Sequence, residues 1–112
     1  MDKEYKVKVT RQAMAQMKEI VQYISVELLA PEAADKLLDK MREAIAKLSV
    51  MPERYAIIEE EPWKQEGIRK VIVNNFLIYY WVDAENLKVQ VIAVIYNRRD
   101  QLRALMNISL EK

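Results

Sequence analysis

The sequence of 112 residues contains no cysteine and no histidine. These absences exclude disulfide bonds, thiolate nucleophiles, imidazole acid–base catalysis and the usual ligands of zinc. No apolar run approaches the roughly 20 residues that a membrane-spanning helix needs, and the N-terminus does not have the pattern of a signal peptide. We therefore expect a cytoplasmic protein that has no membrane partner, holds no metal and needs no cofactor.

Neither sign of charge dominates, because 18 Lys and Arg face 17 Asp and Glu, and the formal net charge is +1. No long-range field therefore favours nucleic acid or anionic lipid, and any site for a polyanion has to be a local patch. Hydrophobic residues make up 52% of the chain, with only one Gly and three Pro, which is typical of a compact globular protein. The length predicts a single domain over residues 1–112.

The first half of the chain predicts one strand and two helices. Residues 5–9 alternate apolar and polar side chains, as a strand with one covered face does. Thr10 can then cap a helix over residues 11–28, and Pro31 suits the start of a second helix over residues 31–49. A connector of about three residues requires the two helices to fold back on each other as an antiparallel hairpin.

The second half predicts an antiparallel meander. Residues 52–66 lack periodicity and predict a long loop with at most one short turn of helix. Asn74 and Asn75 suit a two-residue hairpin turn, and we expect Asn75→Pro to abolish the pairing by removing a positive φ. Three segments rich in β-branched and aromatic residues predict strands at 68–73, 76–82 and 87–96.

The order of these elements predicts an α+β fold. Its parts are an N-terminal strand, an antiparallel helical hairpin packed on one face of a small antiparallel β-sheet, and a short C-terminal helix over residues 100–107. We find no internal repeat and no low-complexity segment.

Several segments resemble a known family when taken in order. Residues 67–83 and 95–100, together with the junction at 28–34 and the stretch at 51–55, resemble the RelE/ParE toxin superfamily of bacterial type II toxin–antitoxin pairs. The resemblance covers nearly the whole chain. It implies a small cytoplasmic toxin that a co-expressed antitoxin neutralises and that acts on DNA gyrase or on messenger RNA in the ribosome.

Individual residues distinguish the two activities. The ribosome-dependent ribonucleases of this superfamily need cations around the scissile phosphate and groups that move protons. One such cation usually follows the aromatic residue that opens the middle strand, and that position is Leu77 here. A second cation is matched by Arg99, whereas the C-terminal acid–base residue has no clear match. The runs 75–80 and 96–100 look more like the ParE branch, so the resemblance implies a toxin that binds gyrase.

The alternatives remain open at this point. A ribonuclease would use Arg99, Arg98 and Arg69 as phosphate cations and Tyr96 for proton transfer. An inactive relative would only occupy an antitoxin or regulate transcription with it. For the gyrase reading, the expected target-binding residues are Arg98, Arg99, Leu102, Arg103 and Met106. The same arginines could equally form a solvated strand end with Asp100 as their salt-bridge partner.

Trp63 is the most informative residue of the long loop. A large aromatic side chain beside a proline either fills the edge of the core or anchors a partner. We expect Trp63 to contact the antitoxin, which we expect to lie over the helical hairpin and the edge of the sheet as an extended or helical segment.

Overall fold

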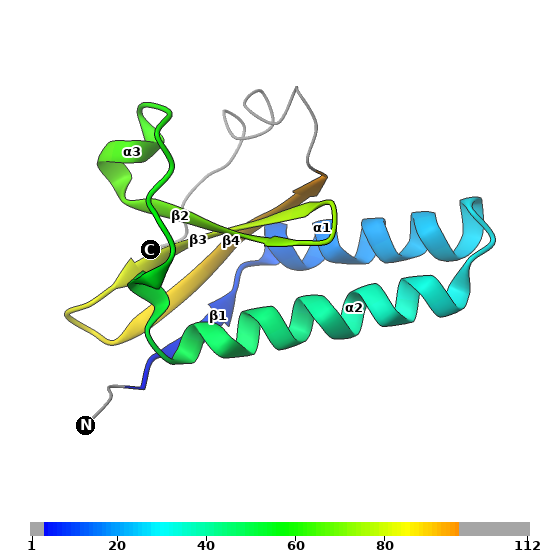
Figure 1. Ribbon diagram of the computed structural model, residues 1–112, viewed down its shortest axis with the longest axis horizontal. Helices are drawn as coiled ribbons and strands as arrows, with labels where there is room; N and C mark the ends of the chain where they lie inside the picture. The colour runs from blue at the N-terminus through cyan, green and yellow to red at the C-terminus, as the bar shows by residue number, and fades with distance from the viewer. Residues whose placement is uncertain (1–3, 97–112) are drawn as a thin grey trace.

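A computed structural model describes residues 4–96 of the chain. The expected C-terminal helix and the expected target-binding residues therefore lie outside the described residues. Within the described part the α+β fold is confirmed, and Figure 1 shows a twisted sheet with a long helical hairpin on one face. No helix of this part is long and apolar enough to cross a membrane.

The sheet has four strands in the order β1-β4-β3-β2. The meander of β2 (Ile68–Val73), β3 (Phe76–Asp83) and β4 (Lys88–Tyr96) is antiparallel, as expected. The first strand, β1 (Lys6–Val9), pairs with β4 in the parallel direction, so the expectation of a wholly antiparallel sheet is wrong. No tight turn connects β1 to its neighbour, and a partner that is distant in sequence can therefore pair in either direction.

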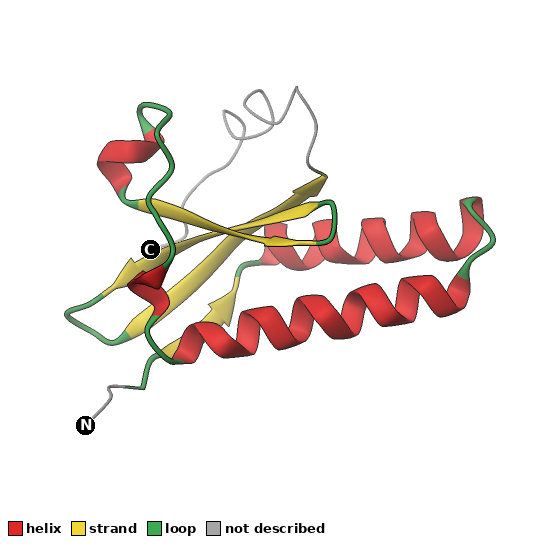
Figure 2. Cartoon of the chain, viewed as in Figure 1, coloured by secondary structure: helices red, strands yellow, loops and turns green. Residues whose placement is uncertain are grey.

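The two helices lie where the periodicity predicts them. Helix α1 (Arg11–Gln22) begins after Thr10, whose hydroxyl accepts a hydrogen bond from the Ala13 amide at 3.2 Å. The last turn, Tyr23–Glu27, widens into a π-helix, and α2 (Pro31–Ala46) follows and ends in a 3₁₀ turn. Figure 2 shows the hairpin that results from the short connector.

The sheet has a hydrophobic cluster on each face. The larger cluster joins the sheet to the helices through side chains such as Met17, Met41 and Ile78. The smaller one lies on the opposite face and contains Leu77 and Tyr79. Because side chains alternate along a strand, β3 supplies both clusters, and most of it is buried.

The turn between β2 and β3 differs from the expectation in one respect. Val73 pairs with Phe76, so the loop has two residues, as predicted. Only Asn74 has a positive φ, at 54°, and Asn75 has none. The expected reason for Asn75→Pro to abolish pairing is therefore wrong, since a proline at that position would not remove a left-handed conformation.

The segment 52–66 is mostly loop, with a 3₁₀ turn at Pro52–Arg54 and the four-residue helix α3 (Trp63–Glu66). Helix α3 ends at Gly67, whose φ of 74° is the left-handed conformation that glycine adopts without strain. This segment leads the chain back to the sheet on the side away from the helices, where Ile58 enters the smaller cluster.

Candidate functional site: an apolar groove on the helical hairpin

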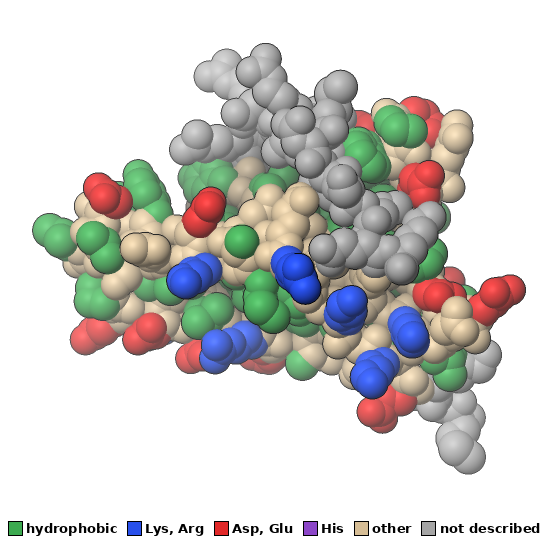
Figure 3. Space-filling view, turned by 180° about the vertical axis from the view of Figure 1, so that it is seen from behind, with side chains coloured by type: hydrophobic (Ala, Val, Ile, Leu, Met, Phe, Trp, Pro, Cys, Tyr) green, Lys and Arg blue, Asp and Glu red, His purple; other side chains and the backbone are tan. Residues whose placement is uncertain are grey.

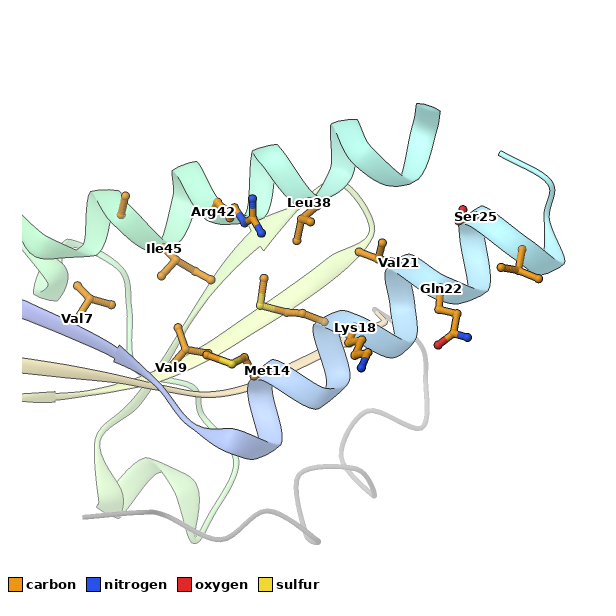
Figure 4. A pocket seen from close by; sticks show the side chains of 13 residues that line it. Val7, Val9, Met14, Lys18, Val21, Gln22, Ser25, Leu38, Arg42 and Ile45 are labelled. Atoms are coloured by element: carbon orange, nitrogen blue, oxygen red, sulfur yellow. The ribbon is translucent and has the colours of Figure 1, made fainter. Parts of the chain in front are cut away.

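An apolar groove lies between the two long helices and the edge strand β1. Its cavity volume is about 900 Å³. Val7 and Val9 line it from β1, because the alternation along this strand turns them toward the helices. Figure 4 shows side chains from α1 and α2 converging on the same space, among them Val21, Leu38 and Ile45.

The groove exists because the helical hairpin is longer than the strand beneath it. The 16 residues of α2 span about 24 Å, whereas the four residues of β1 span about 13 Å. Figure 1 shows the connected end of the hairpin extending beyond the sheet. Apolar side chains on that part of the hairpin consequently have no sheet to pack against.

Exposure values agree with an uncovered apolar surface on the hairpin. Met14 is 61% exposed and Val26 57%, and both line the groove. Nearby, Leu29 in the connector is 84% exposed. Lys18 and Arg42 are exposed at the rim of the groove (Figure 4), so the surface combines apolar walls with positive charge. Such a surface suits an amphipathic segment that carries acidic side chains.

Strand β1 adds an open edge to this surface. It has only one strand neighbour, β4, in the described sheet. The amides of Lys6 and Thr10 donate to carbonyls on the β4 side, at 2.9 and 3.0 Å. In a strand the backbone groups of alternate residues point to opposite sides, so those of Val7 and Val9 face away from β4. They can pair with an added strand.

The structure uses Arg69 to hold a loop. Its guanidinium donates to the carbonyl oxygens of Glu53, at 3.1 Å, and of Tyr55, and it lies 3.9 Å from the Glu53 carboxylate. The Arg69 side chain is only 16% exposed. Its donors therefore point at the 3₁₀ turn and away from open solvent.

Tyr96 lies far from Arg69 along the sheet. Arg69 pairs with Tyr80, which pairs with Val91, and Tyr96 follows Val91 by five positions along β4. That separation is roughly 16 Å along the strand. Tyr96 is 46% exposed and makes an edge-to-face contact with Phe76, with ring centroids 5.3 Å apart. The structure does not bring these two candidate catalytic residues together.

Two other tyrosines of the sheet are poor proton-transfer groups near neutral pH. Burial, with a smaller contribution from the nearby Glu60 carboxylate, raises the pKa of Tyr79 to about 12. Burial also raises the pKa of Tyr80 to about 12, against a smaller opposite effect of Arg69. The Tyr80 hydroxyl donates to the Pro52 carbonyl at 2.6 Å, so this tyrosine helps Arg69 to fix the turn.

Trp63 lies on the side of the sheet opposite the groove. Its ring is half-buried against the smaller hydrophobic cluster, and its indole nitrogen is buried with no hydrogen-bond partner among the described residues. The role of Trp63 in antitoxin binding stays a prediction. The expected target-binding residues and Arg99 lie beyond residue 96, where the structure describes no residues.

The groove could not be predicted from the sequence. Its residues follow the ordinary helical and strand periodicities that also predict a core, and nothing in that pattern says that the hairpin outgrows the sheet. The signal in the sequence was a difference in length, because the two predicted helices have almost 20 residues each and the predicted strand has five.

The fold is shared with toxins of known structure. The chromosomal ParDE toxin–antitoxin system of P. aeruginosa matches with a TM-score of 0.69 at 22% identity, covering 85% of this chain and 98% of the other. The RelBE2 toxin–antitoxin complex of Mycobacterium tuberculosis matches with a TM-score of 0.58 at 18% identity, covering 83% and 91%. These likenesses define the fold as that of the RelE/ParE toxins.

The family itself is shown by the sequence. The family of the ParE toxin of the type II toxin–antitoxin system, parDE, matches residues 7–101, which is most of the chain. The chain therefore belongs to the ParE toxin family and is the toxin of a type II toxin–antitoxin system. A comparison with curated proteins finds no match.

Proposed function

We propose that this toxin inhibits DNA gyrase by binding it in the cytoplasm and that it carries out no chemistry. The observation that carries the proposal is Leu77. At the position where ribonucleases of the superfamily place a cation, this chain has an aliphatic side chain that is 1% exposed and part of a hydrophobic cluster. A buried leucine cannot stabilise the charge that develops on a scissile phosphate.

The placement of Arg69 also supports binding over catalysis. A catalytic cation has to direct its donors at the reacting phosphate. The donors of Arg69 are directed at the carbonyl oxygens of Glu53 and Tyr55. Val91 lies in the same cross-strand row as Arg69, and roughly 16 Å of β4 separates Val91 from Tyr96. Arg69 and Tyr96, two of the three residues that a ribonuclease would use, thus lack a common site.

The proposal is tested by assaying two targets side by side. Purified toxin is added to gyrase with supercoiled DNA, and to translating ribosomes with a defined message. We expect gyrase-linked DNA breaks or lost supercoiling activity, reversed by the cognate antitoxin, and intact message. Arg99→Ala should lower gyrase affinity and toxicity together, because it removes a contact used for binding.

Tyr96→Phe is the matched variant for the alternative activity. It should leave gyrase inhibition unchanged if no proton is transferred. Message cleavage by the wild type that is lost in Tyr96→Phe at unchanged ribosome binding would replace the gyrase proposal with the ribonuclease. If the wild type has neither activity, the result favours an inactive relative that only occupies its antitoxin.

We further propose that the antitoxin occupies the apolar groove. Its segment would place apolar side chains between Val21 and Leu38 and acidic side chains near Lys18 and Arg42, and an extended part could add a strand to β1. The exposed apolar side chains of the hairpin support this position, because a partner that covers them removes them from water.

A further inference from the structure

The free edge of β1 is open over three residues only. Before the strand, the Tyr5 amide donates to the Ser49 carbonyl at 2.7 Å, so the 3₁₀ turn at the end of α2 lies beside the start of β1. After the strand, helix α1 begins two residues beyond Val9. The open part of the edge is therefore Val7, Lys8 and Val9, and a strand added there has three positions to pair with.

The groups along this open edge point in fixed directions. The Lys6 amide donates toward β4 at 2.9 Å, so by alternation the backbone groups of Lys8 also point to β4 and those of Val7 and Val9 point outward. The two valine side chains line the groove, whereas the exposed Lys8 side chain lies on the other face of the sheet. An added antiparallel strand would exchange hydrogen bonds with both valines, and its middle residue would oppose Lys8 in a pair without hydrogen bonds, where side chains come closest.

Lys8 has no compensating charge in the part of the chain that the structure describes. Its neighbour on β4 is the uncharged Gln90. No described carboxylate lies within 4.0 Å of its ammonium group. The net charge of the chain is only +1, but Figure 3 shows a row of Lys and Arg side chains across one face, with most of the acidic side chains toward its two ends. An acidic side chain opposite Lys8 would therefore meet a charge that is still available for pairing.

We propose that Lys8 selects the strand that the antitoxin adds to β1. This strand runs antiparallel to β1 and has an acidic residue between two apolar residues. The apolar residues oppose Val7 and Val9 and extend the wall of the groove, and the acidic residue opposes Lys8, because opposite charges at opposed positions stabilise a sheet pair. The inference rests on the proposed position of the antitoxin in the groove and adds the sequence pattern that its strand must have.

A second copy of the toxin fits the same edge poorly. Two copies of β1 that pair all three open residues place each Val7 opposite a Val9 and the two Lys8 side chains opposite each other. Like charges at opposed positions destabilise the pairing, and here they meet at the closest spacing. Lysine is a common means by which edge strands avoid pairing with one another. The edge can thus stay open for the antitoxin without joining free toxin molecules.

The first test is calorimetry with the full-length toxin and its full-length cognate antitoxin. Lys8→Glu should weaken the complex at least tenfold and Lys8→Gln by less, and both losses should shrink at high salt, because salt screens exposed charges. Lys36→Glu makes the same change of charge at an exposed position on α2 and should change the affinity less than twofold. Equal affinities for Lys8→Glu and the wild type would overturn the proposal.

A comparison with the groove separates the two possible failures. If Met14→Asp weakens the complex and Lys8→Glu does not, the antitoxin occupies the groove without an acidic residue opposite Lys8, and only this inference fails. If neither variant weakens the complex, the position of the antitoxin in the groove fails as well. Neither measurement involves gyrase, so both results are independent of the cellular target.

The second test exchanges the two charges. Each acidic residue of the antitoxin is replaced by lysine in turn, and each variant is measured with the wild-type toxin and with Lys8→Glu. One replacement, at an acidic residue with an apolar residue on each side, should weaken binding to the wild type and restore binding to Lys8→Glu at least tenfold. Rescue by no acidic residue, or by one outside this pattern, would overturn the proposal.

Sedimentation velocity of the free toxin tests a second copy as the occupant of the edge. Lys8→Gln removes the opposed charges and should self-associate at least threefold more tightly than the wild type. Lys36→Gln is the matched control and should behave as the wild type does. If the wild type self-associated as tightly as Lys8→Gln, the lysine would not keep a second copy from this edge, and its role in selection would be wrong.

Discussion

At the scale of single residues, Arg69 is a candidate catalytic cation in the sequence but holds a loop in the structure. Arg69→Met should lower the free energy of unfolding by about 1.5 to 3 kcal/mol, because hydrogen bonds from a charged donor to two carbonyl oxygens are lost. Urea denaturation measures the change. Lys70→Met, which removes the same charge from the opposite face of β2, should cost less than about 0.5 kcal/mol. Equal costs would mean that the loop does not depend on the guanidinium.

The buried tyrosines predict how stability changes with pH. A phenol that ionises near pH 10 in the unfolded chain does so only at about 12 in the folded protein, for both Tyr79 and Tyr80. The folded state therefore binds more protons in this range, and its stabilisation, complete below pH 10, is lost as the pH rises toward 12. Urea denaturation from pH 9 to 12 should show this loss, with a smaller slope in Tyr79→Phe. Equal slopes for the two proteins would contradict the assignment.

At the scale of elements, the β2–β3 turn depends on the left-handed conformation at Asn74. Asn74→Gly should leave stability unchanged or raise it by up to about 1 kcal/mol, because glycine adopts a positive φ without strain. Asn74→Pro should cost about 3 kcal/mol or more, since proline fixes φ near −65°. Thermal unfolding compares both with Asn75→Pro. A larger loss of stability in Asn75→Pro than in Asn74→Pro would contradict the left-handed conformation at Asn74.

A polar contact fixes α1 on the sheet next to a β-bulge. The Gln16 side-chain oxygen accepts a hydrogen bond from the amide of the buried Val94 at 2.8 Å. The pairing of β3 with β4 shifts by one residue nearby, leaving Ile92 as the extra residue. Gln16→Met keeps the volume but leaves this amide without an acceptor, so we expect a loss of about 1 to 3 kcal/mol.

Chemical denaturation measures this loss, and Gln22→Met provides the control, because Gln22 is exposed on the same helix. The control should change stability by less than about 0.5 kcal/mol. If Gln16→Met were as stable as the wild type, water would have to replace the lost acceptor, and the contact would not fix the helix.

Most elements could be predicted from the sequence because their periodicities are local. The stripes of α1 and α2 and the alternation in β1 each report one covered face. The parallel pairing of β1 could not be predicted in this way, since it depends on a strand some 80 residues away in sequence. The same holds for the contact of Arg69 with the turn, because the two segments meet only in the folded chain.

At the scale of the whole molecule, the two faces of the sheet differ. The helical face carries the apolar groove, whereas the opposite face carries the smaller hydrophobic cluster with Trp63 packed against it. If Trp63 anchors the antitoxin, Trp63→Ala should weaken the complex by about 2 kcal/mol or more in calorimetry. If Trp63 only packs against the smaller cluster, the variant should lose stability and keep its affinity. The two readouts together assign the residue.

If the antitoxin occupies the groove, a substitution in the groove should weaken the complex in the same calorimetric measurement. Met14→Asp places a charge in the apolar wall, where an antitoxin side chain would have to desolvate it, and should weaken the complex at least tenfold, or about 1.4 kcal/mol. The toxin should stay folded, because Met14 is 61% exposed and an acidic residue near the start of a helix is favourable. Ile72→Asp is the matched control, with 59% exposure on the opposite face of the sheet. If Ile72→Asp weakened the complex and Met14→Asp did not, the antitoxin would bind the opposite face of the sheet and not the groove.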